Sequence, residues 1–293
     1  MKIAIYGPEY NARSKSTIET VSKYLKETAS SVFVEKQFYN SILSHSDLKL
    51  HSYNFETFES LDTSFNLLIS IGGDGTILRA ITLVKDLGIH IVGINTGRLG
   101  FLATIRADAI HGALGQILKG QYRLSKRSVL NLVMENDSKK FNLDFALNEI
   151  AVSRKNTTSM ISIETWLDEE YLTTYWADGL IISTPTGSTG YSLSCGGPVI
   201  MPESDSLVLT PIAPHNLNAR PLVISAKHKI KLRVSGREDE FLVSLDSRIY
   251  SLKSSTEITI TAAPYHINMI ELEGGSFIET LRKKLLWGAD QRN

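Results

Sequence analysis

The first third of the chain alternates between short apolar runs and segments whose apolar residues recur at helical spacing. Lys2 to Tyr6 is an apolar run that predicts a strand closed by Gly7-Pro8. A helix is predicted after a Ser/Thr-rich start, because apolar residues stand three or four positions apart at Ile18, Val21 and Leu25. Residues 31 to 66 show neither period clearly, so we assign them only loosely.

The same alternation resumes at the continuous apolar run Leu67 to Ile71, which predicts a buried strand. A helix is predicted from about Thr76, since apolar residues then recur at Ile77, Ala80, Ile81 and Val84. After a break at Gly88 we expect a strand from Ile89 to Ile94, then a helix from Asp108 to Leu118 that ends at Gly120. Strands separated by helices predict a Rossmann-like parallel α/β domain, in which ligands lie at the carboxyl ends of strands.

Beyond about residue 124 the pattern changes to short β-like runs with turns at close spacing. The runs are Val129 to Met134, Glu149 to Ser153, Ile161 to Trp166, Tyr171 to Trp176, Leu207 to Thr210, Ile230 to Val234, Phe241 to Leu245 and Ile258 to Thr261. Asp168-Glu169-Glu170 lies between two of these runs, as a hairpin loop would. This half is predicted to be an antiparallel β-sandwich-like domain.

The change of period divides the chain into domains. We expect an α/β domain over residues 1–123 and an antiparallel β domain over residues 124–265. Residues 266–293 are expected to pack back on the first domain, because Phe277 to Trp287 has apolar residues at helical spacing.

The composition mainly excludes certain classes of partner and certain kinds of site. Lys plus Arg and Asp plus Glu number 31 each among 293 residues, so no global positive field favours nucleic acid or a membrane surface as a partner. Cys195 is the only cysteine, and the seven histidines lack zinc-ligand spacing, which argues against disulfides, a zinc site and an iron–sulfur cluster. No apolar run approaches the roughly 18 residues that span a bilayer, and the N-terminus lacks a signal-peptide core, so we expect a cytoplasmic protein.

The glycine-rich turn after Leu67 to Ile71 carries the first candidate chemistry. Its residues are Gly72, Gly73, Asp74, Gly75 and Thr76. Glycines let backbone N–H groups approach an anion at the helix N-terminus, and a carboxylate there can take a hydroxyl proton or orient a metal ion in phosphoryl transfer. Neither a Walker A lysine nor G-x-G-x-x-G spacing is present. The alternative is a plain strand-to-helix turn in which Asp74 makes a local Asx-type bond.

A second polar, glycine-punctuated cluster runs from Asp178 to Pro198. Its hydroxyls beside glycines offer hydrogen bonds to ribose or phosphate oxygens, and Tyr191 offers an aromatic face for a base. The alternative is a surface loop, although the cluster follows a strongly apolar strand and is unusually long for a loop. A nucleophile elbow is excluded, because Thr186 rather than Gly stands two positions before Ser188.

Three further groups give weaker signals. Asn148-Glu149 opens a predicted strand, and its amide and carboxylate suit the two hydroxyls of a ribose. His215, within Pro214-His215-Asn216, is either a ligand contact or, more commonly, an ordinary structural histidine. Arg282-Lys283-Lys284 is most simply a solvated helix face whose charge suits a helix C-terminus.

Taken together, these motifs resemble the NAD kinase family. The resemblance covers roughly residues 67–250, with the motifs in the family's order. It rests on Gly72-Gly73-Asp74-Gly75-Thr76, Gly93-Ile94-Asn95, Leu99-Gly100-Phe101-Leu102, Asn148-Glu149, the cluster from Asp178 to Pro198, Pro211-Ile212-Ala213-Pro214-His215 and Arg220-Pro221-Leu222. Similar glycine-rich loops occur in phosphofructokinases and lipid kinases, but the Asn148-Glu149 pair and the hydroxyl cluster favour the NAD kinase branch.

The resemblance implies transfer of the γ-phosphoryl group of ATP to the 2′-hydroxyl of the adenosine ribose of NAD, which gives NADP. It implies that Asp74 is the general base within a phosphate loop, that Gly75 contacts the substrate, and that Arg79 reaches a phosphate. In the β domain the implied dinucleotide contacts are Asn148 and Glu149 on ribose hydroxyls, Asp178 on the nicotinamide side, Thr189, Gly190, Tyr191, Ser192, Leu193 and Ser194 on the dinucleotide, and Ala213 beside a base.

The family also implies a divalent cation, Mg²⁺ by expectation, which screens the triphosphate without a dedicated protein metal site. It further implies a homodimer or homotetramer.

Two positions depart from the family pattern. Trp176 stands where relatives often carry Arg, which leaves the choice between NAD and NADH open, and Asp246-Ser247-Arg248 stands where many relatives have Asp-Gly. The competing hypotheses are a lipid or sugar kinase with the same loop, and a dinucleotide sensor without turnover.

Overall fold

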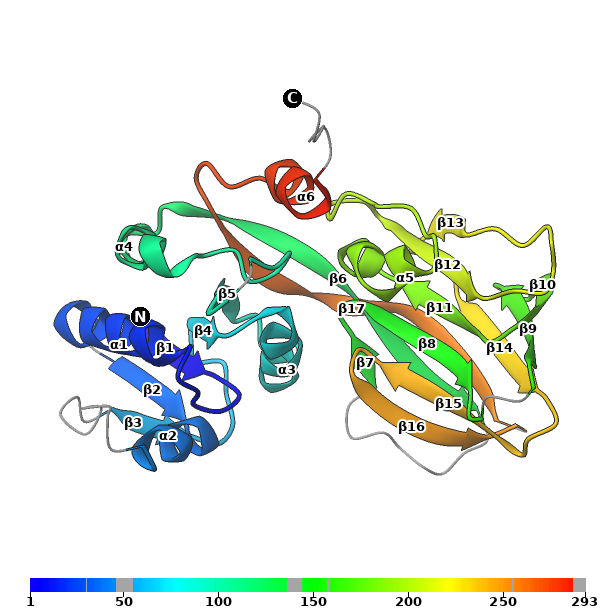
Figure 1. Cartoon of the computed structure of the whole chain (residues 1–293), viewed down its shortest axis with the longest axis horizontal. Helices are drawn as coiled ribbons and strands as arrows, with labels where there is room; N and C mark the ends of the chain where they lie inside the picture. Colours follow the sequence, from blue (N-terminus) through cyan, green and yellow to red (C-terminus); the bar gives the residue numbers. More distant parts are fainter. Residues whose placement is uncertain are drawn as a thin grey trace. The chain divides into compact units, whose positions relative to one another are not determined.

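The computed structural model describes residues 1–29, 31–45, 55–97, 99–135, 144–156, 159–254 and 256–286 (Figure 1). The chain divides into two compact units. Unit 1 comprises Met1–Lys126 and the chain from Ile267 onward, and unit 2 comprises Arg127–His266. Two long strands, β6 (Tyr122–Glu135) and β17 (Glu257–Leu272), run from one unit into the other.

Unit 1 is built on a parallel sheet with the strand order β3-β2-β1-β4-β5-β17. The five strands that precede β6 are β1 (Lys2–Tyr6), β2 (Ser31–Glu35), β3 (Glu56–Phe58), β4 (Leu67–Ile71) and β5 (His90–Ile94). All five residues of β4 are buried, as expected for a central strand of a parallel sheet that is covered on both faces. The carboxyl end of β4 leads directly into the glycine-rich turn.

The helices of unit 1 are α1 (Lys15–Thr28), α2 (Lys36–Leu43), α3 (Asp74–Val84), α4 (Ile110–Leu118) and α6 (Phe277–Leu285). Helix α1 buries Ile18, Val21 and Leu25, and it lies beside α4 (Figure 1). The Glu35 carboxylate caps α2 by accepting two of its first backbone N–H groups. The Ser276 hydroxyl caps α6 in the same way, by accepting from Glu279 N at 3.0 Å.

Unit 2 contains two antiparallel sheets, with the strand orders β10-β9-β14-β17 and β13-β12-β11-β8-β15-β16 (Figure 1). The strands are β7 (Phe145–Ala146), β8 (Glu149–Arg154), β9 (Ile161–Leu167), β10 (Glu170–Ala177), β11 (Gly179–Ser183), β12 (Ser206–Ile212), β13 (Leu222–Ser225), β14 (Ile230–Ser235), β15 (Glu240–Leu245) and β16 (Arg248–Lys253). Inward residues of both sheets form one apolar core; β14 contributes Ile230, Leu232 and Val234 and turns Arg233 outward. This alternation is typical of a β-sandwich.

The predicted fold class is therefore confirmed: a Rossmann-like α/β part, an antiparallel β part and a C-terminal helix. The loosely assigned residues 31–66 contain β2, α2 and β3. Among the described residues, no helix is both long and apolar enough to cross a membrane.

Several boundaries differ from those predicted. Helix α3 begins at Asp74, two residues before Thr76, and a 3₁₀ turn over Ala107–Ala109 precedes α4. Strand β17 extends far beyond the predicted Ile258 to Thr261. The predicted C-terminal helix ends at Leu285, and its last predicted residue, Trp287, lies outside the described residues.

Candidate functional site

The glycine-rich turn joins the end of β4 to the first residue of α3. A Cβ at Gly72 would lie 2.2 Å from Thr76 Oγ1, so only glycine fits that position without a shift of Thr76. Gly72 N donates to Ile94 O at 2.9 Å, which ties the turn to the end of β5. Gly73 and Gly75 are exposed, and no described atom lies within 4 Å of a Cβ placed at either. The turn is thus fixed on one side and open to a ligand on the other.

Asp74 uses its carboxylate to hold a distant loop. Its Oδ2 accepts a hydrogen bond from Phe101 N at 2.8 Å, and its Oδ1 accepts from Leu102 N at 3.0 Å and Ala103 N at 2.9 Å. A Cβ at Gly100 would lie 1.8 Å from Asp74 Oδ1, so the loop approaches this closely because residue 100 is glycine. The observed bonds span 27 to 29 residues, unlike those of a local Asx turn.

The loop that Asp74 holds also contacts α6 within unit 1. The Phe101 ring lies 6.2 Å from the Phe277 ring, and Lys284 Nζ lies 5.6 Å from the centre of the Phe101 ring. Arg79 is exposed on α3, slightly more than one turn after Asp74. Burial raises the pKa of Tyr6, at the end of β1, and the Arg79 charge opposes this rise. Arg79 therefore lies near the carboxyl edge of the parallel sheet.

Asn148 and Glu149 stand at the start of β8, as predicted, and the end of β11 holds their backbone. Thr184 N donates to Asn148 O at 2.9 Å, and Thr184 Oγ1 donates to Leu147 O at 2.6 Å. The Asn148 Oδ1 and Glu149 Oε2 atoms are buried and have no hydrogen-bond partner among the described residues. Because buried polar atoms are rarely left unpaired, these two acceptors are candidates for a hydrogen bond from a ligand or from water.

The hydroxyl cluster packs against this pair as a short 3₁₀ turn, Thr186–Thr189, followed by α5 (Tyr191–Ser194). It is no surface loop, since many of its hydroxyl residues are buried: Ser183, Thr184, Thr186, Ser188 and Ser192. Ser192 Oγ is paired with Thr210 Oγ1 at 2.8 Å. Thr186 belongs to the predicted hydroxyl cluster but was not among the individually implied contacts; its Oγ1 is buried without a partner among the described residues, which makes it a third candidate ligand contact.

The backbone N–H of Tyr191 donates to the Glu149 carboxylate, which favours its ionised form. Burial raises the pKa of Glu149 to about 8, and the neighbouring Asp246 carboxylate adds to the rise. Burial likewise raises the pKa of Tyr191, with further contributions from Cys195, Asp178 and Glu149. Tyr191 therefore lies within electrostatic reach of both Glu149 and Asp178.

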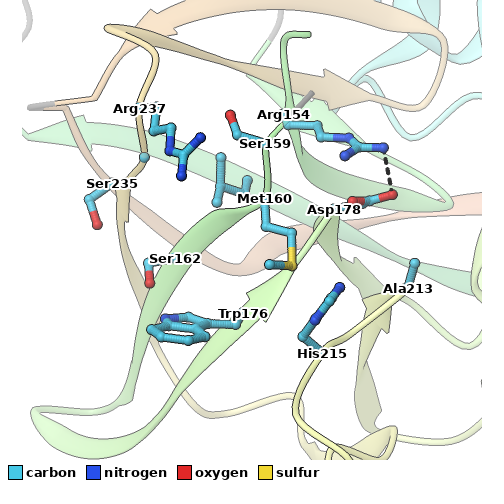
Figure 2. Close-up of a pocket in the computed structure, with 12 residues that line it drawn as sticks. Arg154, Ser159, Met160, Ser162, Trp176, Asp178, Ala213, His215, Ser235 and Arg237 are labelled. Atoms are coloured by element: carbon cyan, nitrogen blue, oxygen red, sulfur yellow. Dashed lines mark ion pairs between the residues drawn. The ribbon is translucent and has the colours of Figure 1, made fainter. Parts of the chain in front are cut away.

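A cavity of about 900 Å³ in unit 2 brings Asp178 and Ala213 together (Figure 2). Arg154 Nη2 lies 2.9 Å from Asp178 Oδ2, and Trp176 and His215 form the neighbouring wall. His215 N donates to Trp176 O at 2.7 Å, which fixes the His215 loop to β10. The backbone of His215 therefore has a structural role, and its side chain lines the cavity, where a ligand contact stays a prediction.

Family models match both halves of the chain. The ATP-NAD kinase N-terminal domain matches residues 3–122, and the ATP-NAD kinase C-terminal domain matches residues 147–272. This chain belongs to the NAD kinase family. The NAD kinase of Christiangramia forsetii is 58% identical over 296 residues, and that of Bacteroides fragilis 43% over 292, with 100% of both chains covered in each case.

Two solved structures agree with this chain in fold. The NAD kinase of Archaeoglobus fulgidus in complex with ATP superposes with a TM-score of 0.74 at 26% identity, covering 98% of this chain and 99% of that one. Yeast NADH kinase complexed with NADH gives a TM-score of 0.86 at 22% identity, covering 99% of this chain and 89% of that one. At that identity, the second match bears on the fold alone.

A resident metal site is not apparent in the described part of the chain, where no three His, Cys, Asp or Glu side chains are grouped to hold an ion. In unit 1 three backbone N–H groups already occupy acceptor positions of the Asp74 carboxylate. Mg²⁺ is commonly bound through substrate phosphates and water, with few protein ligands.

Glu149→Gln is expected to stabilise the protein at pH 8.5 and to change its stability much less at pH 5. The folded-state pKa of about 8 lies above the ordinary 4.5, so the folded chain keeps a proton that the unfolded chain releases. The carboxyl therefore costs stability progressively as the pH rises from 4.5 to 8. The expected gain at pH 8.5 is on the order of 2–4 kcal/mol.

Thermal unfolding midpoints at the two pH values measure this difference. Glu203→Gln, at an exposed position, is the matched control and should show no such pH dependence. Equal shifts of the Glu149→Gln protein at both pH values would contradict a buried, ionising carboxyl.

Proposed function

We propose that this chain is an NAD kinase in activity: it transfers the γ-phosphoryl group of ATP to the 2′-hydroxyl of the adenosine ribose of NAD and releases NADP and ADP. The observation that carries the proposal is the pair of unpartnered acceptors, Asn148 Oδ1 and Glu149 Oε2, beside the hydroxyl cluster. Two neighbouring acceptors suit vicinal ribose hydroxyls, which donate in parallel.

Asp74 is proposed as the general base. An ionised carboxylate has about four acceptor positions, and three backbone N–H groups occupy two on Oδ1 and one on Oδ2. Oδ2 therefore retains a position for a hydroxyl proton. As the ribose oxygen bonds to the γ-phosphorus, its proton passes to Asp74, the bond from that phosphorus to the bridging oxygen breaks, and ADP leaves.

The phosphoryl donor is proposed to bind as Mg²⁺–ATP, with the open side of Gly73 and Gly75 facing the phosphates. The ion supplies charge neutralisation on the triphosphate when it is bound. Thr76 is buried beneath the turn and shapes it, and Arg79 is proposed to contact a phosphate from the next turn of α3. The NAD kinase of Archaeoglobus fulgidus, solved with ATP, supports this choice of donor.

The remaining contacts are proposed as follows. Asp178 is proposed to face the nicotinamide side, and Ala213 is proposed to lie beside a base. Both residues line the same cavity. The dinucleotide is contacted by Thr189, Gly190, Tyr191, Ser192, Leu193 and Ser194, and Thr186 is added to this set because its Oγ1 is buried without a partner among the described residues. Trp176 also lines that cavity, and we propose that it contributes to the choice between NAD and NADH. The enzyme is further proposed to act in the cytoplasm as a homodimer or homotetramer.

A coupled assay tests the activity directly. Purified protein is supplied with NAD, ATP and Mg²⁺, and NADP is read through an NADP-specific dehydrogenase. Saturable NADP formation is the expected result. NAD binding without turnover would indicate a sensor, and neither binding nor turnover would direct the search to lipid or sugar acceptors.

A further inference from the structure

The turn between β15 and β16 places the buried side chain of Asp246 against the backbone of the proposed ribose-binding pair, Asn148 and Glu149. Asp246 adopts a left-handed backbone with φ 53°, and its side chain is 1% exposed. Its Oδ1 accepts from Asn148 N at 2.8 Å and Glu149 N at 3.3 Å, and its Oδ2 accepts from Leu147 N at 3.0 Å. Asp246 N also donates to Glu149 O at 2.9 Å. One residue thus makes four hydrogen bonds to three consecutive positions.

Arg248 contacts the same backbone two residues earlier, at Phe145. Its Nη2 lies 3.7 Å from Asp246 Oδ2 and donates a hydrogen bond to Phe145 O. Its guanidinium lies 5.2 Å from the centre of the Phe145 ring. Asp246 and Arg248 together therefore hold the backbone from Phe145 to Glu149, and the cation offsets part of the cost of burying the carboxylate.

Turn formation alone does not explain these contacts, as a comparison within unit 2 shows. Asp168 also adopts a left-handed backbone, with φ 54°, in the β9–β10 hairpin. Its side chain is 59% exposed, and its carboxylate accepts from Lys229 N at 2.8 Å and contacts His228. A left-handed aspartate in a hairpin of this chain therefore needs no burial. What distinguishes Asp246 is the segment that it holds.

We propose that Asp246 and Arg248 are positioning residues for NAD, which fix the backbone of Asn148 and Glu149 so that their unpartnered acceptors meet the ribose hydroxyls. This inference rests on the proposed function. Neither residue is required to touch the substrate. The inference also gives Arg248, at a position that departs from the family pattern, a defined role.

Replacing Asp246 with Asn removes this hold with little change in shape. An amide side chain has one acceptor oxygen and an NH₂ group that cannot accept, so at least one of the three backbone donors loses its partner. Buried donors without partners are costly, and the backbone of Asn148 and Glu149 is expected to shift. Loss of the Asp246 charge also favours the ionised form of Glu149, whose other electrostatic neighbours are the backbone N–H and the side chain of Tyr191.

Steady-state kinetics of the full chain test the proposal. Asp246→Asn should raise KM for NAD by roughly ten- to one-hundred-fold while leaving KM for ATP unchanged. The pH dependence of KM for NAD, expected to inflect near 8 in the unchanged enzyme, should move to lower pH. Asp168→Asn is the matched control and should leave both quantities unchanged. An Asp246→Asn enzyme with an unchanged KM for NAD and pH profile overturns the proposal.

Arg248→Gln decides the matter if the Asp246 variant does not fold. It removes the cation and the contact with Phe145 O, and KM for NAD should again rise with KM for ATP unchanged; no change overturns the proposal. Calorimetric NAD binding on the same proteins separates this inference from the proposed function. Binding without NADP formation by the unchanged chain ends the kinase proposal, and the variants' NAD affinity then tests positioning alone. No NAD binding by the unchanged chain overturns both.

Discussion

Asp74→Asn is expected to lower kcat for NADP formation by about 10²- to 10⁴-fold. The substitution removes the proposed base, since an amide does not take up a proton from the ribose hydroxyl. It also turns an NH₂ group toward some of the backbone N–H groups of Phe101, Leu102 and Ala103, which need acceptors. The loss therefore combines missing chemistry with a loosened loop.

The coupled assay and NAD calorimetry measure the two parts. NAD affinity should fall far less than kcat, because the proposed ribose acceptors Asn148 and Glu149 remain in place. Asp86→Asn, an exposed aspartate just beyond α3, should behave as the unchanged enzyme. Wild-type turnover by the Asp74→Asn protein would remove Asp74 from the mechanism.

The parallel sheet of unit 1 could be predicted well, for a physical reason. Central strands that are covered on both faces appear in sequence as uninterrupted apolar runs, and the predicted bounds of β1 and β4 match the observed ones. Elements with little burial were harder. Strand β3 has three residues, of which only Phe58 is buried, and α2 has eight residues, so neither gives a long enough period.

The sequence predicts which residues form the candidate site better than it predicts their hydrogen-bond partners. Asn148, Glu149 and the hydroxyl cluster stand out in the sequence, but burial decides which hydroxyls are available: Ser192 is paired inside, whereas Thr186 is not. The segment from Thr186 to Ser194 contains two short helices of four residues each, separated by Gly190, which periodicity cannot detect. Asp246 holds residues 97 to 99 positions away, and no local pattern reveals contacts of that range.

In each unit, an aspartate carboxylate holds a segment of the candidate site through backbone hydrogen bonds. In unit 1 the Asp74 carboxylate accepts three consecutive backbone N–H groups, and in unit 2 the Asp246 carboxylate does the same. Charge-assisted bonds of this kind are stronger than neutral ones and fix a loop that lacks regular structure. Asp74 is partly exposed and Asp246 is buried. This difference in exposure agrees with a base that meets substrate and a positioning residue that does not.

Gly100→Ala is the second substitution with a large expected effect, because it displaces Asp74 without changing it. The added Cβ would lie 1.8 Å from Asp74 Oδ1 and 2.5 Å from Cγ, far inside contact distance. Either the carboxylate or the loop must move, and the three amide hydrogen bonds cannot all survive. We expect kcat to fall by roughly ten- to one-hundred-fold and stability by about 1–3 kcal/mol.

Gly97→Ala is the matched control, since it adds the same methyl group to the same loop where no described atom lies within 4 Å. It should retain turnover and thermal stability. Assays run well below the unfolding midpoint of each variant separate lost activity from lost fold. If Gly100→Ala turned over NAD as fast as the Gly97→Ala control, the grip of Asp74 on the Phe101–Ala103 amides would be dispensable. Asp74 would then act through its proton chemistry alone.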